Sequence, residues 1–279
     1  MNPFSALLLG IIQGLTEFLP ISSTAHLTLA GKFLGVIDPA NPEAWTEFIA
    51  VMQLGTVAAV IVYFWKDLVA MALAFFKGIF SSAEGARGPQ FRMAINVIVG
   101  TLPVAIIGIA FRKVIEGSLT KTTVVIAASM ITLALLLWLA ERIAKHVRTL
   151  DDLKWKDALI IGFCQACALI PGSSRSGTTI TGGLFLGFMR EAAARFSFLL
   201  SVPAVVASGL LELKEIHGTF ELGVGNLIIS TVVSGIVGYA AIAWLLRYLM
   251  RHTTMVFIWY RLALGALLII LLWNGLLQP

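Results

Sequence analysis

Charged residues are scarce in this chain of 279 residues, at 13% against roughly 25% for a soluble domain. Hydrophobic residues make up 58% of it, and the mean hydropathy is +0.92. This balance excludes an ordinary water-soluble domain and predicts an all-α protein that crosses a membrane several times. The net charge of +5 does not indicate a nucleic-acid partner, because Lys and Arg lie mainly in short loops between apolar runs.

Cysteine is also rare, and the chain has only Cys164 and Cys167, spaced as CxxC. A redox or metal site with this spacing needs a βαβ pattern or a second ligand pair. The sequence has neither, so we expect both residues to pack within a membrane helix.

Six segments come close to the 20 or so apolar residues that a membrane-spanning helix needs. They cover approximately residues 46–65, 93–111, 122–141, 196–213, 223–246 and 256–275. The run 68–80 is shorter and lies between Lys66 and Lys77, so we expect a helix extension or an interfacial piece there.

Two further apolar regions are interrupted in the middle by polar residues. Region 4–36 contains Pro20 and the run ISST, and region 158–188 contains Pro171 followed by GSSRSGTT. Each predicts a helix, a polar break and a second helix, with halves too short to span. Re-entrant hairpins fit this pattern, since irregular backbone at membrane depth is tolerated only under protein or beside a water-filled cavity.

The two interrupted regions resemble each other at an offset of 152 residues. Nine of the thirty positions from Ala6 to Gly35 are identical in the second region, including the pairs Gln13/Gln165 and Ser22/Ser174. We interpret this as an internal duplication within one integral membrane domain, residues 1–279. The repeats cover approximately residues 1–141 and 158–279, and a basic loop, 142–157, joins them.

The distribution of basic residues predicts the orientation. If each hairpin enters and leaves on one face, thirteen Lys and Arg residues fall on one side of the membrane and five on the other. The richer side is expected in the cytoplasm, which places both termini outside. The two halves then have opposite orientation, and their breaks meet near the bilayer midplane, an arrangement typical of transporters.

In the first break, Gln13 and Glu17 lie four residues apart and therefore on one helix face. A carboxylate at membrane depth costs about 2.5–3.5 kcal/mol on insertion scales, so Glu17 is a candidate functional residue. The alternative is a structural Glu paired with a backbone or hydroxyl donor.

After Pro20, one of Ser22, Ser23 and Thr24 can cap a second helix, whose first N–H groups attract an anion. Ser23 and His26 are three residues apart, which suits a nucleophile and its base. Taken alone, the pair is better explained as a cap serine and a packing histidine.

The second break contains a basic residue at its centre, Arg175, in the middle of an apolar hairpin. Hydroxyl side chains surround it in sequence: Ser173, Ser174, Ser176, Thr178 and Thr179. A buried guanidinium suits a carboxylate or a phosphate. A pair with Glu17 would satisfy the charge, but it would leave the five hydroxyls unexplained.

The two breaks together suit a phosphate group carried by an apolar molecule. Arg261 lies near the start of the last span and has two possible roles: it could snorkel to the membrane interface or make a second contact with this ligand. Two other functions also stay open: an inverted-repeat membrane transporter or lipid flippase, and a non-catalytic lipid-binding protein.

The stretches QGLTEFLPISSTAH (residues 13–26) and PGSSRSGTT (residues 171–179) closely resemble motifs of the bacterial undecaprenyl-diphosphate phosphatase family, the bacitracin-resistance proteins. FIAVMQLGTVAAV and RFSFLLSVPAV match other blocks of that family, so the resemblance covers nearly the whole chain. Its first motif begins with Glu or Gln. Gln13 is therefore within the pattern, but it leaves one acidic metal ligand fewer than in members with Glu there.

The resemblance implies hydrolysis of undecaprenyl diphosphate to the monophosphate in the bacterial cell membrane, which recycles the carrier for peptidoglycan synthesis. It also implies a divalent cation, Mg2+ or Ca2+, with Glu17 and Gln13 as candidate ligands. The implied partners are the polyprenyl diphosphate and membrane lipids, no nucleic acid is expected, and a homodimer is left open. The implied catalytic residues are Glu17, Ser23, His26 and Arg175, and the candidate phosphate-binding residues are Ser22, Thr24, Ser174, Ser176 and Thr179. Whether Ser23 or His26 is the nucleophile is undecided.

Overall fold

The computed structural model describes residues 1–38, 42–80, 87–115, 122–215 and 222–276, and every regular element in them is a helix. The α-helices are α1 (Pro3–Phe18), α2 (Ser23–Phe33), α3 (Pro42–Tyr63), α4 (Trp65–Phe80), α5 (Pro89–Ala110), α6 (Arg112–Ile115), α7 (Thr123–Ile143), α8 (Trp155–Ala166), α9 (Arg175–Phe185), α10 (Arg190–Glu215), α11 (Val224–Leu249) and α12 (Met255–Trp273). Two short 3-10 turns, Leu150–Asp152 and Cys167–Leu169, complete the list.

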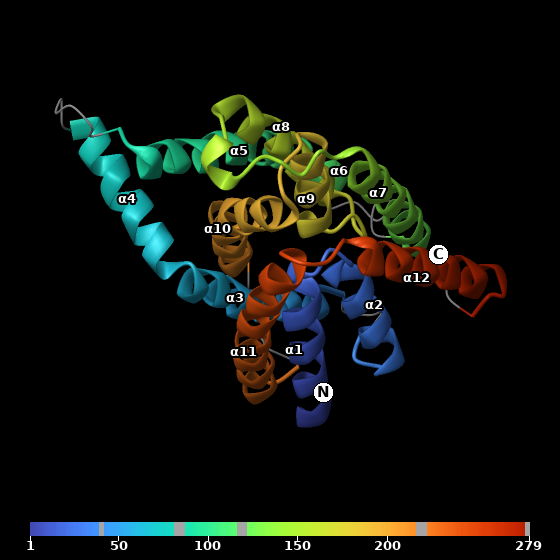
Figure 1. Cartoon of the computed structure of the whole chain (residues 1–279). Helices are drawn as coiled ribbons and strands as arrows, with labels where there is room; N and C mark the ends of the chain where they lie inside the picture. Colours follow the sequence, from blue (N-terminus) through green and yellow to red (C-terminus); the bar gives the residue numbers. More distant parts are fainter. Residues whose placement is uncertain (39–41, 81–86, 116–121, 216–221, 277–279) are drawn as a thin grey trace.

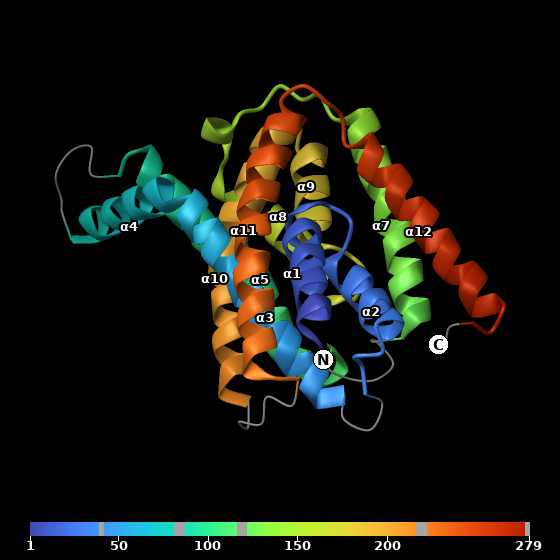
Figure 2. The same cartoon turned by 90° about the horizontal axis from the view of Figure 1, so that it is seen from below.

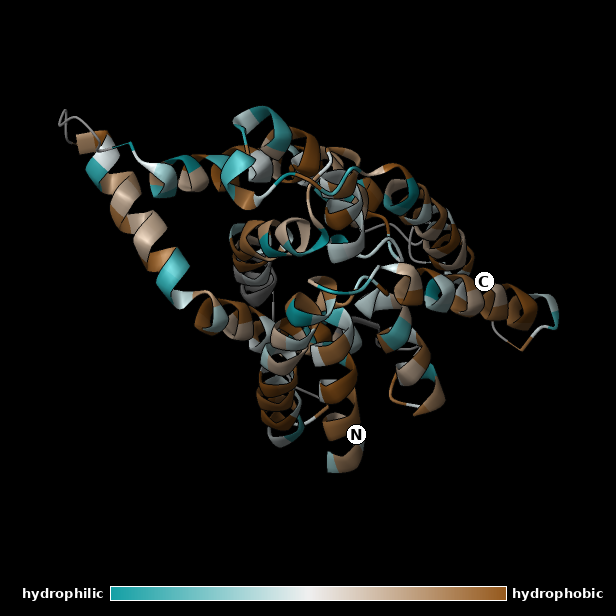
Figure 3. Cartoon of the chain, in the orientation of Figure 1, coloured by the Kyte–Doolittle hydropathy of each residue, from teal (hydrophilic) through white to brown (hydrophobic). Residues whose placement is uncertain are grey.

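All six expected segments form helices, α3, α5, α7, α10, α11 and α12, and all but α10 are candidate membrane spans. Within the described residues, five helical segments are long and apolar enough to cross a membrane: Ala44–Tyr63 of α3, and all of α5, α7, α11 and α12. Large apolar side chains such as Ile109 and Trp273 are exposed on the outside of the bundle, and the outer helices are largely hydrophobic along their length (Figure 3). The chain is thus an all-helical protein with the surface of a multi-pass membrane protein.

The helices pack across the two halves of the sequence. α1 lies along α11, α8 lies along α5, and α7 pairs with α12 (Figures 1 and 2). Close approach at glycine makes such contacts possible: a Cβ on Gly162 of α8 would lie 2.3 Å from the carbonyl oxygen of Gly100 in α5. α4 begins at Trp65, just after the end of α3, and projects from the bundle (Figure 2). The short run 68–80 thus belongs to a helix of its own, and its position at the membrane interface stays a prediction.

The predicted helix–break–helix pattern is present in both interrupted regions. α1 and α2 flank residues 19–22, and α8 and α9 flank residues 167–174. α2 begins at Ser23 and ends at Phe33, while α9 begins at Arg175 and ends at Phe185, so both boundaries agree at the offset of 152. The offset found in the sequence therefore also relates the two local structures.

Cys164 and Cys167 are free thiols. A Cβ on Gly182 of α9 would lie 2.7 Å from Cys164 Sγ, so this sulfur fills a close helix contact, as expected. Cys167 lies beyond the end of α8, in the turn Cys167–Leu169, and is exposed, so the expected packing within a helix is wrong for this residue. Among the described residues, no group of three His, Cys, Asp or Glu side chains could hold a metal ion.

Candidate active site at the two helix breaks

The centre of the site is an ion pair between the two breaks. Arg175 Nη2 donates to Glu17 Oε1 at 2.9 Å. The second carboxylate oxygen, Oε2, accepts from Ser23 Oγ at 2.8 Å and from Gln13 Nε2 at 3.2 Å. The expected ion pair is thus present. Its carboxylate, Glu17, also accepts a hydrogen bond from Ser23, the candidate nucleophile.

Each break ends in a serine with unusual backbone geometry. Ser22 has φ 76° and Ser174 has φ 65°, a region that costs a residue with a side chain about 1–3 kcal/mol. Their hydroxyls cap the helices that follow, because Ser22 Oγ accepts from Ala25 N at 3.4 Å and Ser174 Oγ accepts from Gly177 N at 3.2 Å. Such strain is typical of functional turns.

The N-termini of α2 and α9 meet at one cavity of about 250 Å³. Its polar lining residues are Glu17, Ser22, Ser23, Thr24, Gln53, Gln165, Ser174 and Arg175. Its apolar lining residues are Val104, Ala168, Leu169, Ile170, Ala204 and Val205, with Gly172 between them. The first N–H groups of a helix have no acceptor within the helix, so two helix starts present donors and positive dipole ends to one space.

His26 is held away from Ser23. Its Nδ1 lies 2.7 Å from the carbonyl oxygen of Ser22, and its Nε2 lies 2.6 Å from the Tyr260 hydroxyl, with the two rings stacked. A carbonyl can only accept, so Nδ1 carries a proton. The predicted pairing of Ser23 with His26 is therefore wrong for this geometry, because Glu17 is the acceptor for the Ser23 hydroxyl.

Two of the predicted phosphate-binding hydroxyls are engaged inside the protein. Ser176 Oγ donates to the carbonyl oxygen of Leu19 at 3.1 Å and so links the two breaks. Thr179 is fully buried, and its Oγ1 lies 2.7 Å from the carbonyl oxygen of Arg175 and 2.6 Å from Ser197 Oγ. Ser22, Thr24 and Ser174 line the cavity, whereas Ser176 and Thr179 lie behind it.

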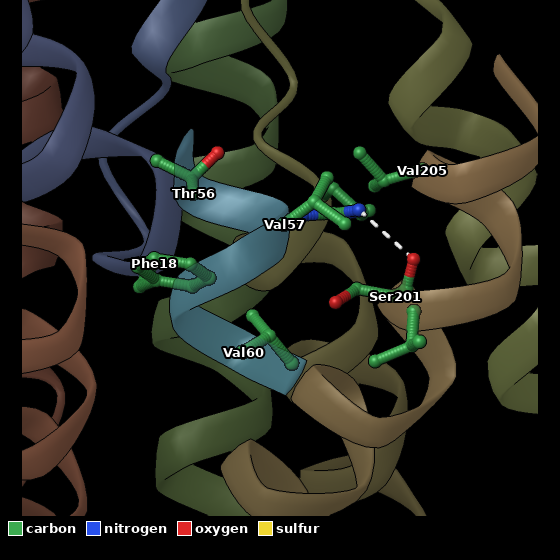
Figure 4. A pocket seen from close by; sticks show the side chains of 8 residues that line it. Phe18, Thr56, Val57, Val60, Ser201 and Val205 are labelled. Carbon is green, nitrogen blue, oxygen red and sulfur yellow. Dashed lines mark hydrogen bonds between the residues drawn. The ribbon is translucent and has the colours of Figure 1, made fainter. Parts of the chain in front are cut away.

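Arg175 also contacts the helices on its other side. Its Nη1 donates to the carbonyl oxygen of Ser201 in α10 at 3.5 Å, and Figure 4 shows Val57, Val60 and Val205 around this bond. These apolar neighbours keep water from one side of the guanidinium, which strengthens its interaction with anions.

Arg261 of α12 is fully buried, and within the described residues its guanidinium donates to backbone carbonyl oxygens. It donates to Pro20 at 3.4 Å in the first break, and to Gly172 at 3.3 Å and Ser173 at 3.0 Å in the second. Interface snorkelling is therefore wrong for this residue. Arg261 ties the two breaks together from behind.

Replacing Arg261 with Met should lower the free energy of unfolding by about 3 kcal/mol, because buried carbonyls lose their donors. Thermal unfolding of the purified protein in detergent measures the loss. Arg251→Met, at an exposed arginine just beyond α11, is the control and should stay within about 0.5 kcal/mol of the unchanged chain. Equal stability of Arg261→Met and Arg251→Met would contradict the conclusion that Arg261 holds the two breaks together.

Sequence reasoning missed three polar neighbours of the site: Gln53, Gln165 and Tyr260. Gln53 lies within an apolar span, and in the sequence Gln165 stands out only as a repeat position. Tyr260 reaches His26 from 234 positions further along the chain, which no local pattern predicts. A polar amide inside an apolar helix is the one sequence signal that could have indicated Gln53 and Gln165.

These features define a polytopic helical membrane protein with a polar cavity between two capped helix starts. The family model described as bacitracin resistance protein BacA matches residues 6–267. The chain is 53% identical over 274 residues to an undecaprenyl-diphosphatase of Syntrophobacter fumaroxidans (strain DSM 10017 / MPOB), covering 96% of this chain and 97% of the relative. An undecaprenyl-diphosphatase of Myxococcus xanthus (strain DK1622) is 50% identical over 280 residues, covering 100% and 92%. The chain belongs to the bacitracin resistance protein BacA family.

Proposed function

We propose that this chain hydrolyses undecaprenyl diphosphate to undecaprenyl phosphate and inorganic phosphate, returning the lipid carrier to cell-wall synthesis. The compared relatives bear the name of this activity. The observation that carries the proposal is the single cavity lined by both helix starts and by the Glu17–Arg175 pair. Helix N-termini and a guanidinium suit a diphosphate, and the apolar lining suits the prenyl chain.

In the proposed first step, Ser23 Oγ attacks the terminal phosphorus and its proton passes to Glu17 Oε2, the acceptor at 2.8 Å. The bond from phosphorus to the bridging oxygen breaks, which releases undecaprenyl phosphate and leaves phosphoserine. Water then attacks the phosphorus of phosphoserine, the bond from phosphorus to Ser23 Oγ breaks, and Glu17 returns its proton to Oγ. This step restores the hydroxyl and frees inorganic phosphate, which keeps the protons of the water. Arg175 and the N–H groups of the two helix starts offset the charge on the phosphoryl oxygens, the main catalytic need in phosphoryl transfer.

His26 remains in the proposed set with a role that follows from its contacts. Its Nδ1–H holds the Ser22 carbonyl, and thus the turn that carries Ser23. Ser176 and Thr179 act from behind the phosphate, where they fix the start of α9. Thr24, Ser22 and Ser174 are the proposed hydroxyl contacts of the phosphate at the cavity.

We also propose that Mg2+ or Ca2+ binds with the substrate. Mg2+ is usually held by one or two carboxylates together with substrate phosphates. Glu17 supplies one carboxylate, and the neighbouring Gln13 Oε1 is buried without a hydrogen-bond partner in the described residues, so this donor set fits. The ion would neutralise negative charge on the diphosphate.

We also propose that the two helix–break–helix regions are re-entrant hairpins and that the two halves of the chain are inverted repeats. α2 and α9 have 11 residues each, so each is about 16 Å long, half of a hydrocarbon core of about 30 Å. α1 and its repeat counterpart α8 each pack against a long helix of the other half, α1 against α11 and α8 against α5, which supports the inverted repeat. The basic loop 142–157 lies at one end of the bundle, and the start of α1 and the end of α12 lie toward the other (Figure 2), which supports termini outside. We further propose that the cavity opens to the outer face.

Phosphate release separates this function from transport. Protein purified in detergent should release inorganic phosphate from undecaprenyl diphosphate when Mg2+ or Ca2+ is present. A flippase or a passive lipid-binding protein would move or bind the lipid in vesicles and release none. Absence of phosphate with both ions would refute the enzymatic proposal.

A further inference from the structure

Gln165 of α8 is a polar side chain without a protein partner in the site. It is 1% exposed and lines the cavity of about 250 Å³. Neither its Nε2 nor its Oε1 has a hydrogen-bond partner among the described residues. Buried side-chain amides are nearly always hydrogen-bonded, so an amide left open at a cavity wall points to a ligand.

The equivalent residue in the first half explains why Gln165 is open. Gln13 lies 152 positions earlier, and its Nε2 donates to Glu17 Oε2 one helical turn further on, at 3.2 Å. One turn after Gln165 the chain has Leu169 instead of a carboxylate. The amide hydrogens of Gln165 are therefore not taken up along its own helix.

The backbone that carries Gln165 is fixed by the close contact between α8 and α5. Gly162 lies one turn before it, and a Cβ there would meet the carbonyl oxygen of Gly100 at 2.3 Å. A rigid helix holds the amide at the cavity wall, which is what a binding residue needs.

We propose that Gln165 Nε2 donates a hydrogen bond to the diphosphate of the substrate. The proposal rests on the proposed function and names α8 as a further contributor to its substrate-binding site. Arg175 and the N–H groups of α2 and α9 line the same cavity, so the group that fits among them is an anion. The side-chain amide of Gln165 would supply one more hydrogen-bond donor to this anion. It would add no charge beside the Glu17–Arg175 pair.

Gln165→Leu tests the proposal with a side chain of similar size. We expect the KM for undecaprenyl diphosphate to rise about tenfold, the effect of one lost hydrogen bond to a charged group. Affinity for a non-hydrolysable methylene diphosphonate analogue should fall by the same factor. The melting temperature should stay equal or rise, because no protein bond is lost.

Asn96→Leu is the matched control, since it makes the same change at a buried amide with a partner. Asn96 Nδ2 donates to the carbonyl oxygen of Leu153 at 3.0 Å, away from the cavity. This variant should melt at a lower temperature and keep the KM of the unchanged chain. A melting temperature lowered in Gln165→Leu as in Asn96→Leu, with unchanged analogue affinity, would overturn the proposal.

Gln165→Glu distinguishes a phosphate contact from a metal ligand. A carboxylate would repel the diphosphate, so KM should rise more than with Leu. A lower Mg2+ concentration for half-maximal activity, with KM unchanged, would assign Gln165 to the metal and overturn the proposal. If the unchanged chain binds the analogue but releases no phosphate from the substrate, the proposed function fails, and the analogue affinities still decide the role of Gln165.

Discussion

Arg175→Met should lower kcat/KM for undecaprenyl diphosphate by at least about a thousandfold. The guanidinium lies at the start of α9 and pairs with Glu17 across the two breaks at 2.9 Å. Arginines that stabilise a transferring phosphoryl group contribute about 10³–10⁵ in rate. Phosphate release by the purified protein measures the loss.

Two variants separate this effect from damage to the fold. Arg175→Lys keeps the charge opposite Glu17 but loses the planar donor pair, so it should fold and still be at least about a hundredfold slower. Arg195→Met removes a half-exposed arginine of α10 that pairs with Asp67 at 2.7 Å, and its activity should stay within about twofold. Wild-type rates in Arg175→Lys would remove Arg175 from the centre of the mechanism.

Ser23→Ala should lower kcat by at least about ten-thousandfold, as the loss of a nucleophile does in other hydrolases. Glu17 keeps its bonds to Arg175 and Gln13 in this variant, so the melting temperature should change little. Thr28→Ala, in the same helix but outside the cavity lining, is the matched control and should keep full activity. Substantial turnover by Ser23→Ala would assign the attack to another group.

Much of the fold followed from hydropathy and from a few polar interruptions. Apolar runs of about 20 residues predicted the spanning helices, and Pro20 and Pro171 with their serines predicted the two breaks. These signals are local, because both the hydrophobic pattern and capping depend on neighbouring residues. The Glu17–Arg175 pair was also expected, since each charge needs a partner at membrane depth.

The parts that failed depend on contacts between distant segments. Ser23 and His26 share a helix face, yet the Tyr260 hydroxyl and the Ser22 carbonyl occupy the imidazole nitrogens. Arg261 lies near a helix end, where the sequence does not show whether an arginine side chain points into the protein or out to the membrane interface. Only the packing of α12 against the breaks shows that it turns inward.

The most direct test of the account is to find where the phosphoryl group goes. The purified protein is mixed with undecaprenyl diphosphate labelled in its terminal phosphate, quenched within the first turnover, and digested for peptide mapping. The account predicts acid-stable label on Ser23, between the starts of α2 and α9. Acid-labile label on His26, or turnover with no label on the protein, would contradict it.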